Sequence, residues 1–150
     1  MNKLHYTIMG DPRTKKNHQM IAGSGKRCPV CSKPAKQWIR QGAAHDNFAE
    51  LARWQLRPAP TQPIDYPVNV RCLFYMQTRR RVDGLNLLAA IDDLLVDCGI
   101  LADDNSRIVM GHDGSRVLYD PDSPRVEITI TPMYEDGQMG LFAGDGHERF

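Results

Sequence analysis

The sequence lacks any long apolar run. No segment approaches the roughly 20 consecutive apolar residues that a transmembrane helix needs, and the first residues, MNKLHYTIMGDPRTKKN, hold no apolar run long enough for a signal peptide. A chain of 150 residues can bury a core large enough to fold without disulfides, so its four cysteines need not pair. We therefore expect a cytoplasmic protein with reduced thiols and no membrane partner.

Internal repeats, low-complexity tracts and a phosphate-binding P-loop are also missing. The one glycine-rich candidate, GSG at residues 23–25, is not followed by the Lys-Ser or Lys-Thr pair that a P-loop requires. These absences argue against a repeat array and against a P-loop nucleotide hydrolase.

Net charge is nearly absent, but the charges are unevenly placed. Residues 1–81 carry 15 Lys and Arg against 4 Asp and Glu, whereas residues 82–150 carry 4 against 14. A basic surface suggests a polyanion such as nucleic acid, and carboxylates beside it could hold a cation that acts on that polyanion. The alternative is that the two halves neutralise each other across the fold or across a dimer.

Apolar residues alternate with polar ones in several segments, which is typical of strands. The clearest pattern lies at residues 68–77, and we expect this strand to be central. Further strands are expected within residues 3–10, on both sides of a tight turn at Asp113-Gly114, and at residues 125–132.

Two helices are expected. The first runs from Ser32 to about Leu56 and buries an apolar face formed by Trp38, Ile39, Phe48, Leu51 and Trp54. The second runs from about Leu85 to Val96, with Asp83 as its N-cap and Gly99 just past its end.

This order of elements favours an α/β or α+β fold, a single domain with a mixed β-sheet and two main helices. The domain is expected to span residues 1–134 and to include a hairpin at about residues 18–33 that carries a cysteine pair. Residues 135–150 are polar and glycine-rich, so we expect a flexible C-terminal tail.

Aspartates gather around the second helix. Asn86, Ala90, Asp93 and Asp97 share one side of it, and Asp103-Asp104 follow its end. About 14 helical residues span roughly 20 Å, so Asp104 can approach Asp83 only if the chain doubles back along the helix.

Such oxygen ligands suit Mg²⁺, which prefers one or two carboxylates with waters and substrate phosphates. Asp83 and Asp104, with the amide oxygen of Asn86 or the carboxylate of Asp93, would form the site. The adjacent cations at residues 79–81 would hold flanking phosphates. Alternatively, these aspartates are helix caps and solvated surface, as we expect for Asp92 and Asp97.

This segment resembles the RusA-type Holliday-junction resolvases, a phage- and prophage-borne endodeoxyribonuclease family. The chain matches the family's arginine-rich strand end, its first Asp, its Asn-Leu pair, its helical Asp, its Gly and its Asp-Asp pair with the residues Arg79, Arg80, Arg81, Asp83, Asn86, Leu87, Asp93, Gly99, Asp103 and Asp104. The segment GDPRTKKN also resembles the family's basic loop, and RVEITI its closing strand. The similarity covers about residues 4–132.

The resemblance implies a RusA-like homodimer with two Mg²⁺-dependent active sites that cut four-way junctions symmetrically, in recombination and repair. Asp83 and Asp104 match two of the family's metal-binding aspartates, and Asn86 and Asp93 complete the candidate catalytic set. Branched DNA would contact both basic segments, at residues Arg13, Lys15, Lys16, Asn17, Arg79, Arg80 and Arg81.

Two positions depart from the family's pattern. Leu85 stands where its best-known members have a second Asp, and Ala89 stands where they have a Lys. The chain therefore either uses another ligand set, with Asn86 or Asp93, or has weak catalysis, or binds junctions without cutting them.

The segment KRCPVCSK holds one CxxC motif, Cys28 and Cys31. A structural zinc ion needs four ligands, so His18 could add a third, or two copies of the chain could form a Cys₄ site. Plain reduced thiols are the main alternative, and a redox role fits the hairpin location badly. Cys72 and Cys98 are expected in the core.

The segment QMGLF in the tail resembles the short peptide by which bacterial replication and repair proteins bind the DNA sliding clamp. Leu141 and Phe142 would enter an apolar pocket while Gln138 makes polar contacts. Alternatively, the two apolar side chains pack on their own domain.

His112 and Asp113 are expected to serve a tight turn and not a catalytic dyad.

Overall fold

A computed structural model of the chain describes residues 2–14, 19–22, 27, 29–33, 38–41 and 43–133. Within this part of the chain, a five-stranded mixed sheet carries two helices, as expected for a single α+β domain. Its strands are β1 (Leu4–Met9), β4 (Val68–Met76), β5 (Val109–Gly111), β6 (Arg116–Tyr119) and β7 (Arg125–Pro132). No helix in the described part is long and apolar enough to cross a membrane.

Strand β4 is central, as predicted. It pairs antiparallel with β7, which pairs antiparallel with β1, and its other edge pairs in parallel with β5 and β6. Every second residue of β4 is buried because one face of the sheet packs against the helices. The buried residues are Val68, Val70, Cys72, Phe74 and Met76.

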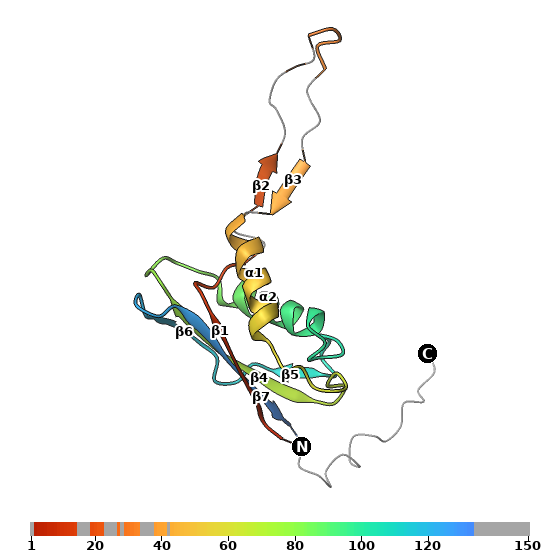
Figure 1. Cartoon of the computed structure of the whole chain (residues 1–150), viewed down its shortest axis with the longest axis vertical. Coiled ribbons are helices and arrows are strands. Elements are labelled where there is room, and N and C mark those ends of the chain that lie inside the picture. The colour runs from red at the N-terminus through yellow and green to blue at the C-terminus, as the bar shows by residue number, and fades with distance from the viewer. Residues whose placement is uncertain are drawn as a thin grey trace, which may run out of the picture.

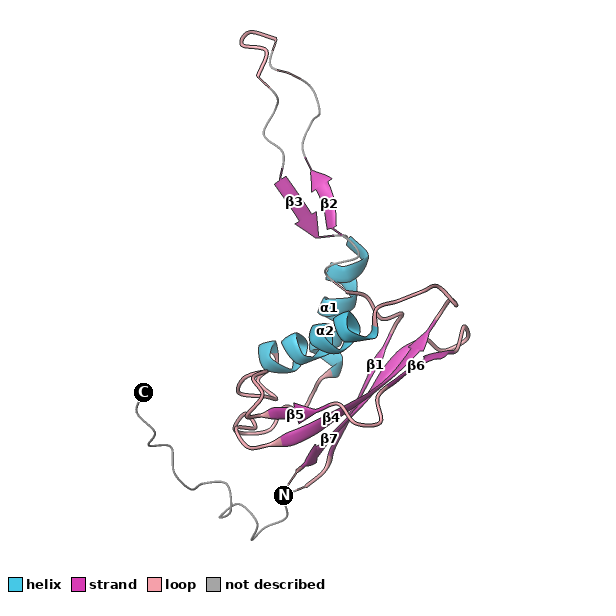
Figure 2. Ribbon diagram, turned by 180° about the vertical axis from the view of Figure 1, so that it is seen from behind, coloured by secondary structure: helices cyan, strands magenta, loops and turns pink. Residues whose placement is uncertain are grey.

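Both helices lie on the same face of this sheet (Figure 1, Figure 2). Helix α2 (Gly84–Asp97) confirms the second predicted helix, with Asp83 as its N-cap. Gly99 has a φ of 72°, a left-handed conformation that favours glycine just after a helix. Helix α2 connects two parallel strands, so the chain returns along the sheet beside β4.

The first helix is shorter than predicted. Helix α1 (Ala43–Gln55) begins eleven residues after Ser32, because β3 (Trp38–Gln41) precedes it and pairs antiparallel with β2 (Gln19–Ala22). This pairing of segments far apart in the sequence overrides the local helical pattern. The hairpin therefore extends from β2 to β3 and includes residues 27 and 29–33 in its connection.

The buried face of α1 also differs from the prediction. Leu51 and Trp54 are exposed, Trp54 at 68%. Phe48 is buried as predicted, and Ala49 and Ala52 on this helix and Leu56 just past its end are also in the core. The two buried alanines have small side chains, so the helix can lie close to the sheet along this face.

The strands that flank Asp113-Gly114 do not pair with each other. Both β5 and β6 pair with β4, so the turn interrupts one edge of the sheet instead of closing a hairpin. The Asn69 side chain fixes this arrangement, since its oxygen accepts from the Asp113 N–H (2.7 Å) and its amide donates to the Asp113 carbonyl (3.2 Å). The turn itself is present as predicted, with Gly114 at a φ of 82°.

Candidate functional site

One carboxylate, Asp11, joins the two basic segments. Its Oδ2 lies 2.8 Å from the Arg13 guanidinium and 3.4 Å from that of Arg80, and its Oδ1 accepts from the Gln77 N–H at 3.0 Å. Arg80 also donates to the Pro12 carbonyl at 3.2 Å. The loop after β1 and the end of β4 are thus held together, although they lie more than 60 residues apart in the sequence.

The other arginines of the second basic segment are more exposed. Arg79 stacks over the ring of Tyr119 on β6, with 4.2 Å between its guanidinium carbon and the ring centroid. Arg81 is exposed at the approach to helix α2. The other predicted DNA-binding residues, Lys15, Lys16 and Asn17, lie outside the described residues.

Asp83 and Asn86 lie together at the head of α2. The Asp83 Oδ1 atom accepts from the backbone N–H groups of Leu85 (3.0 Å) and Asn86 (3.4 Å), and its Oδ2 accepts from the Asn86 side chain (3.0 Å). These N–H groups lie at the N-terminal end of α2, where the helix dipole attracts a negatively charged group. Both oxygens are therefore held in place, and the residue remains exposed to solvent.

The segment after α2 is shaped by Asp103. Its carboxylate accepts from the Asp104 N–H at 2.8 Å and from the Asn105 side chain at 2.7 Å, while Asn105 accepts from the Arg107 N–H at 2.9 Å. The hydrogen bond from Asn105, followed by that from the Asp104 backbone, lowers the Asp103 pKa. Asp103 thus stabilises the turn with its own carboxylate. The neighbouring Asp104 is the candidate metal ligand of this segment.

Asp104 lies in a negative environment. Loss of solvation raises its pKa, and the side chain of Asp103 and the charges of Asp103 and Asp93 raise it further. A cation at this position would relieve that repulsion. Carboxylate oxygens are the type of ligand that a hard divalent ion such as Mg²⁺ prefers.

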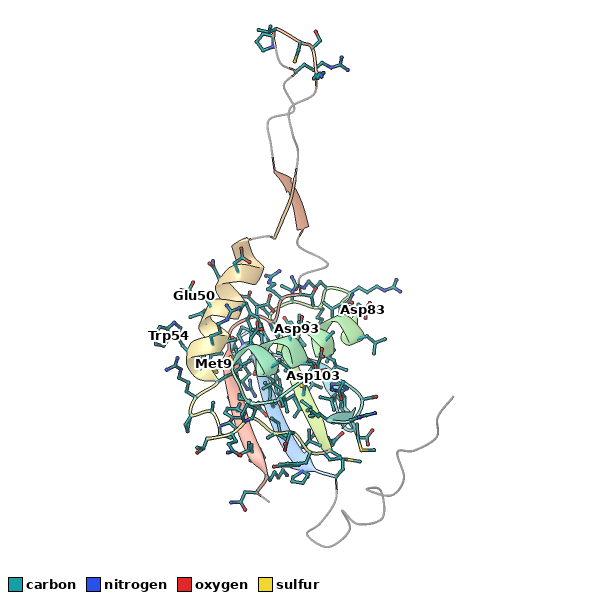
Figure 3. All side chains as sticks on the ribbon, turned by 90° about the vertical axis from the view of Figure 1, so that its right-hand side faces the viewer. Met9, Glu50, Trp54, Asp83, Asp93 and Asp103 are labelled. Atoms are coloured by element: carbon teal, nitrogen blue, oxygen red, sulfur yellow. The ribbon has the colours of Figure 1, made fainter. Side chains whose placement is uncertain are left out.

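The predicted carboxylates fall into two groups along α2. Asp83 lies at the head of the helix, and Asp93 lies farther along it, on the side toward Asp103 (Figure 3). Asp83 is joined to Asn86, whereas the electrostatic contacts of Asp104 are with Asp93 and Asp103. Leu101, which precedes Asp103 in the chain, forms an isolated parallel β-bridge with Ile64, which precedes β4. Across the described ranges, no three His, Cys, Asp or Glu side chains lie close enough together to hold one metal ion.

The pair of Asp92 and His112 was not predicted. Asp92 is only 7% exposed, so its expected place on the solvated surface is wrong, and its Oδ2 accepts from His112 Nε2 at 2.8 Å. The hydrogen bond with Asp92 raises the His112 pKa, although partial burial opposes this effect. Asp92 Oδ1 is buried and has no hydrogen-bond partner among the residues that the structure describes. The tight-turn role of His112 is confirmed, since its carbonyl accepts from the Ser115 N–H.

No spacing in the sequence signals this pair. Asp92 follows the buried Ile91 directly, and only the parallel return of the chain after α2 brings His112 to it. Asp97 is exposed as expected and lies 3.5 Å from Arg53.

The cysteines divide between the core and the surface. Cys72 is fully buried, as predicted, and burial and the nearby Asp92 charge raise its pKa. Cys98 is half-buried against the core. Cys31 is exposed, and Cys28 lies outside the described residues, so the zinc site stays a prediction.

The predicted clamp-binding residues Gln138, Leu141 and Phe142 also lie outside the described residues.

No protein-family model matches the chain, and no curated protein matches it.

Proposed function

We propose that this chain is a Mg²⁺-dependent, structure-selective DNA endonuclease that resolves four-way junctions as a homodimer. The observation that carries the proposal is the cluster around Asp11, which gathers Arg13 and Arg80 next to the segment that leads into Asp83. Arg79 and Arg81 of the same basic segment are exposed, so their positive charges could contact a phosphate backbone. The family resemblance of residues 79–104 supports the same function.

The arginines would bind and orient the DNA. Arginine binds phosphate through a planar fork of donors, and each neutralised phosphate releases counterions from the DNA. Arg79 is stiffened by its contact with Tyr119 and Arg80 by Asp11, so less side-chain freedom is lost when DNA binds. These residues would place a phosphodiester at the head of α2.

The carboxylates would hold the metal ion. A bound Mg²⁺ would neutralise charge on the scissile phosphate and lower the pKa of an attacking water. Two separate sets of oxygen donors could hold it: Asp83 with Asn86 at the head of α2, and Asp104 with Asp93 farther along the helix. Asp83 is already oriented by its three hydrogen bonds, and Asp103 orients the segment that carries Asp104.

The test is cleavage of synthetic four-way junctions. We expect symmetric nicks in Mg²⁺, and we expect Asp104→Asn to abolish cutting while junction binding persists. Asp97→Asn is the matched control, because Asp97 is an exposed aspartate at the C-terminal end of α2 and is not one of the proposed ligands. Junctions that stay intact at saturating protein, in both Mg²⁺ and Mn²⁺, would eliminate the nuclease.

A second candidate function is junction binding without cleavage. It is favoured by Leu85, which is 76% exposed at a position where the resemblance leads us to expect a carboxylate. This function requires gel shifts with junction DNA that survive EDTA, together with uncut DNA in Mg²⁺. If it holds, Leu85→Asp is the substitution expected to bring cleavage activity back.

A further inference from the structure

Strand β6 forms an exposed edge of the sheet. It pairs in parallel with β4, and its other edge pairs with no strand of the described part of the chain. All four of its residues are exposed, and three are large apolar residues, Val117, Leu118 and Tyr119. An exposed apolar edge strand is a template for pairing with another strand.

A small apolar hollow lies beside this edge. It has a volume of about 100 Å³ and lies between the first turns of α2, β4 and β6; it is lined by Phe74, Gly84, Leu88, Ser115, Arg116 and Val117. Leu85, next to Leu88 on the helix surface, is largely exposed. We call Leu85, Leu88, Val117 and Tyr119 the β6 patch.

We propose that the β6 patch is the interface with a second copy of this chain, formed by antiparallel pairing of β6 with itself about a two-fold axis at Leu118. The inference rests on the homodimer of the proposed function and names its interface. An antiparallel pair of identical strands has its two-fold axis perpendicular to the sheet, so both copies keep their helices on the same side.

The register of β6 on β4 decides which residues can meet. Val117 and Tyr119 pair with Phe74 and Met76, so they share the helix-covered face, while Leu118 pairs with Tyr75 on the opposite face. Residues directly opposite in an antiparallel pair point to the same face. Val117 can therefore face Tyr119 of the second copy but cannot face its Leu118.

When the two-fold axis of the strand pair lies at Leu118, residues of opposite charge also face each other. Arg116 then lies opposite Asp120 of the second copy, and the contact occurs twice because of the symmetry. Asp120 extends the strand, since its N–H donates to the Met76 carbonyl at 3.0 Å. Its carboxylate already accepts from Arg125 at 2.9 Å, so Arg116 would act through its charge. Centring on Val117 instead would leave Arg116 opposite Leu118.

The same register fills the hollow. Tyr119 of the second copy would lie against Val117, at the wall that continues to Leu88. An apolar side chain at position 85 is favourable in such an interface, where a carboxylate would have to lose its solvation. This gives Leu85 a function that does not involve the metal.

The first experiment is sedimentation of the full chain without DNA or Mg²⁺. We expect the wild type to be a dimer and Leu118→Glu to raise the dimer dissociation constant by on the order of 100-fold, because two like charges would face each other at the axis. Met9→Glu is the control, since Met9 is an exposed apolar residue on β1 at the opposite edge of the sheet. Circular dichroism checks that both variants fold.

The second experiment tests the register by cysteine cross-linking. In a chain that also carries Cys28→Ser and Cys31→Ser, Leu118→Cys should form a disulfide-linked dimer on oxidation, because residues directly opposite have Cβ atoms about 4.5–5.5 Å apart. Val117→Cys in the same chain should not cross-link. A monomeric wild type, a dimeric Leu118→Glu variant or cross-linking through Val117→Cys would each overturn the proposal. Loss of junction cleavage by a dimeric protein would instead refute only the nuclease.

Discussion

The His112 Nε2 atom lies 2.8 Å from Asp92 Oδ2 and ties helix α2 to the turn that follows β5. Among the described residues, Asp113 acts on His112 through its charge, and Asp92 acts on the buried Cys72 thiol. Because the hydrogen bond with Asp92 raises the His112 pKa, folding favours the protonated imidazole.

Stability should therefore depend on pH through His112. A raised pKa in the folded state stabilises the protein fully below the unfolded-state pKa of about 6.5, and this contribution is lost as the pH rises through the folded-state value. Urea unfolding between pH 5 and 9 should show this loss in the wild type and not in His112→Gln. Equal pH profiles for the two proteins would contradict the assignment.

Removal of His112 should also destabilise the fold at constant pH. His112→Ala leaves the buried Asp92 carboxylate without its hydrogen bond, which costs about 1–3 kcal/mol or more for a charged group. The free energy of unfolding in urea at pH 6 measures this loss. His5→Ala is the control, because His5 is exposed and bonds only at the surface, to Thr129.

Asp11 should support DNA binding although it carries the charge that DNA repels. Asp11→Asn removes the anion that holds Arg13 and Arg80, so we expect junction affinity to fall severalfold and the thermal midpoint to decrease. Asp65→Asn is the matched control, since Asp65 is an exposed carboxylate and its loss changes the net charge equally. Higher affinity in both variants would show that only net charge matters.

The parts of the fold that depend on local signals could be predicted from the sequence. Alternation at residues 68–77 identified β4, and the cap at Asp83 and the glycine at position 99 bounded α2 within a residue or two. The start of α1 could not be found this way, because residues 38–41 are extended only through their pairing with β2.

In the candidate site, too, contacts between residues close in the sequence could be predicted, and contacts between distant residues could not. Asp83 and Asn86 are three residues apart on one helix, so their contact follows from helix geometry. Asp92 was expected on the solvated surface of the helix. It is instead buried on the side that also carries the buried residues Ile91 and Leu95, and His112 forms a hydrogen bond with its carboxylate. Asp11 was missed because its two arginine partners come together only in the folded chain.

Arg81 should contribute a phosphate contact. We expect Arg81→Ala to weaken binding to all junction sequences alike and to reduce the slope of log K against log salt by roughly 0.9 for one lost contact with duplex DNA. Fluorescence anisotropy over a salt series measures the slope. Arg57→Ala is the control, because Arg57 lies just past the end of α1, over Trp54. An unchanged slope for Arg81→Ala would place this residue outside the DNA interface.

Two substitutions of Asp83 should separate its capping role from its proposed catalytic role. Asparagine caps helices about as well as aspartate, whereas alanine at the N-cap costs about 0.5–2 kcal/mol. We therefore expect Asp83→Asn to retain the free energy of unfolding and lose junction cleavage, and Asp83→Ala to lose both. Urea unfolding and cleavage assays on the same preparations give the two readings. If Asp83→Asn cuts junctions at the wild-type rate, Asp83 is only a cap, and the metal ion must be held by Asp104 and Asp93.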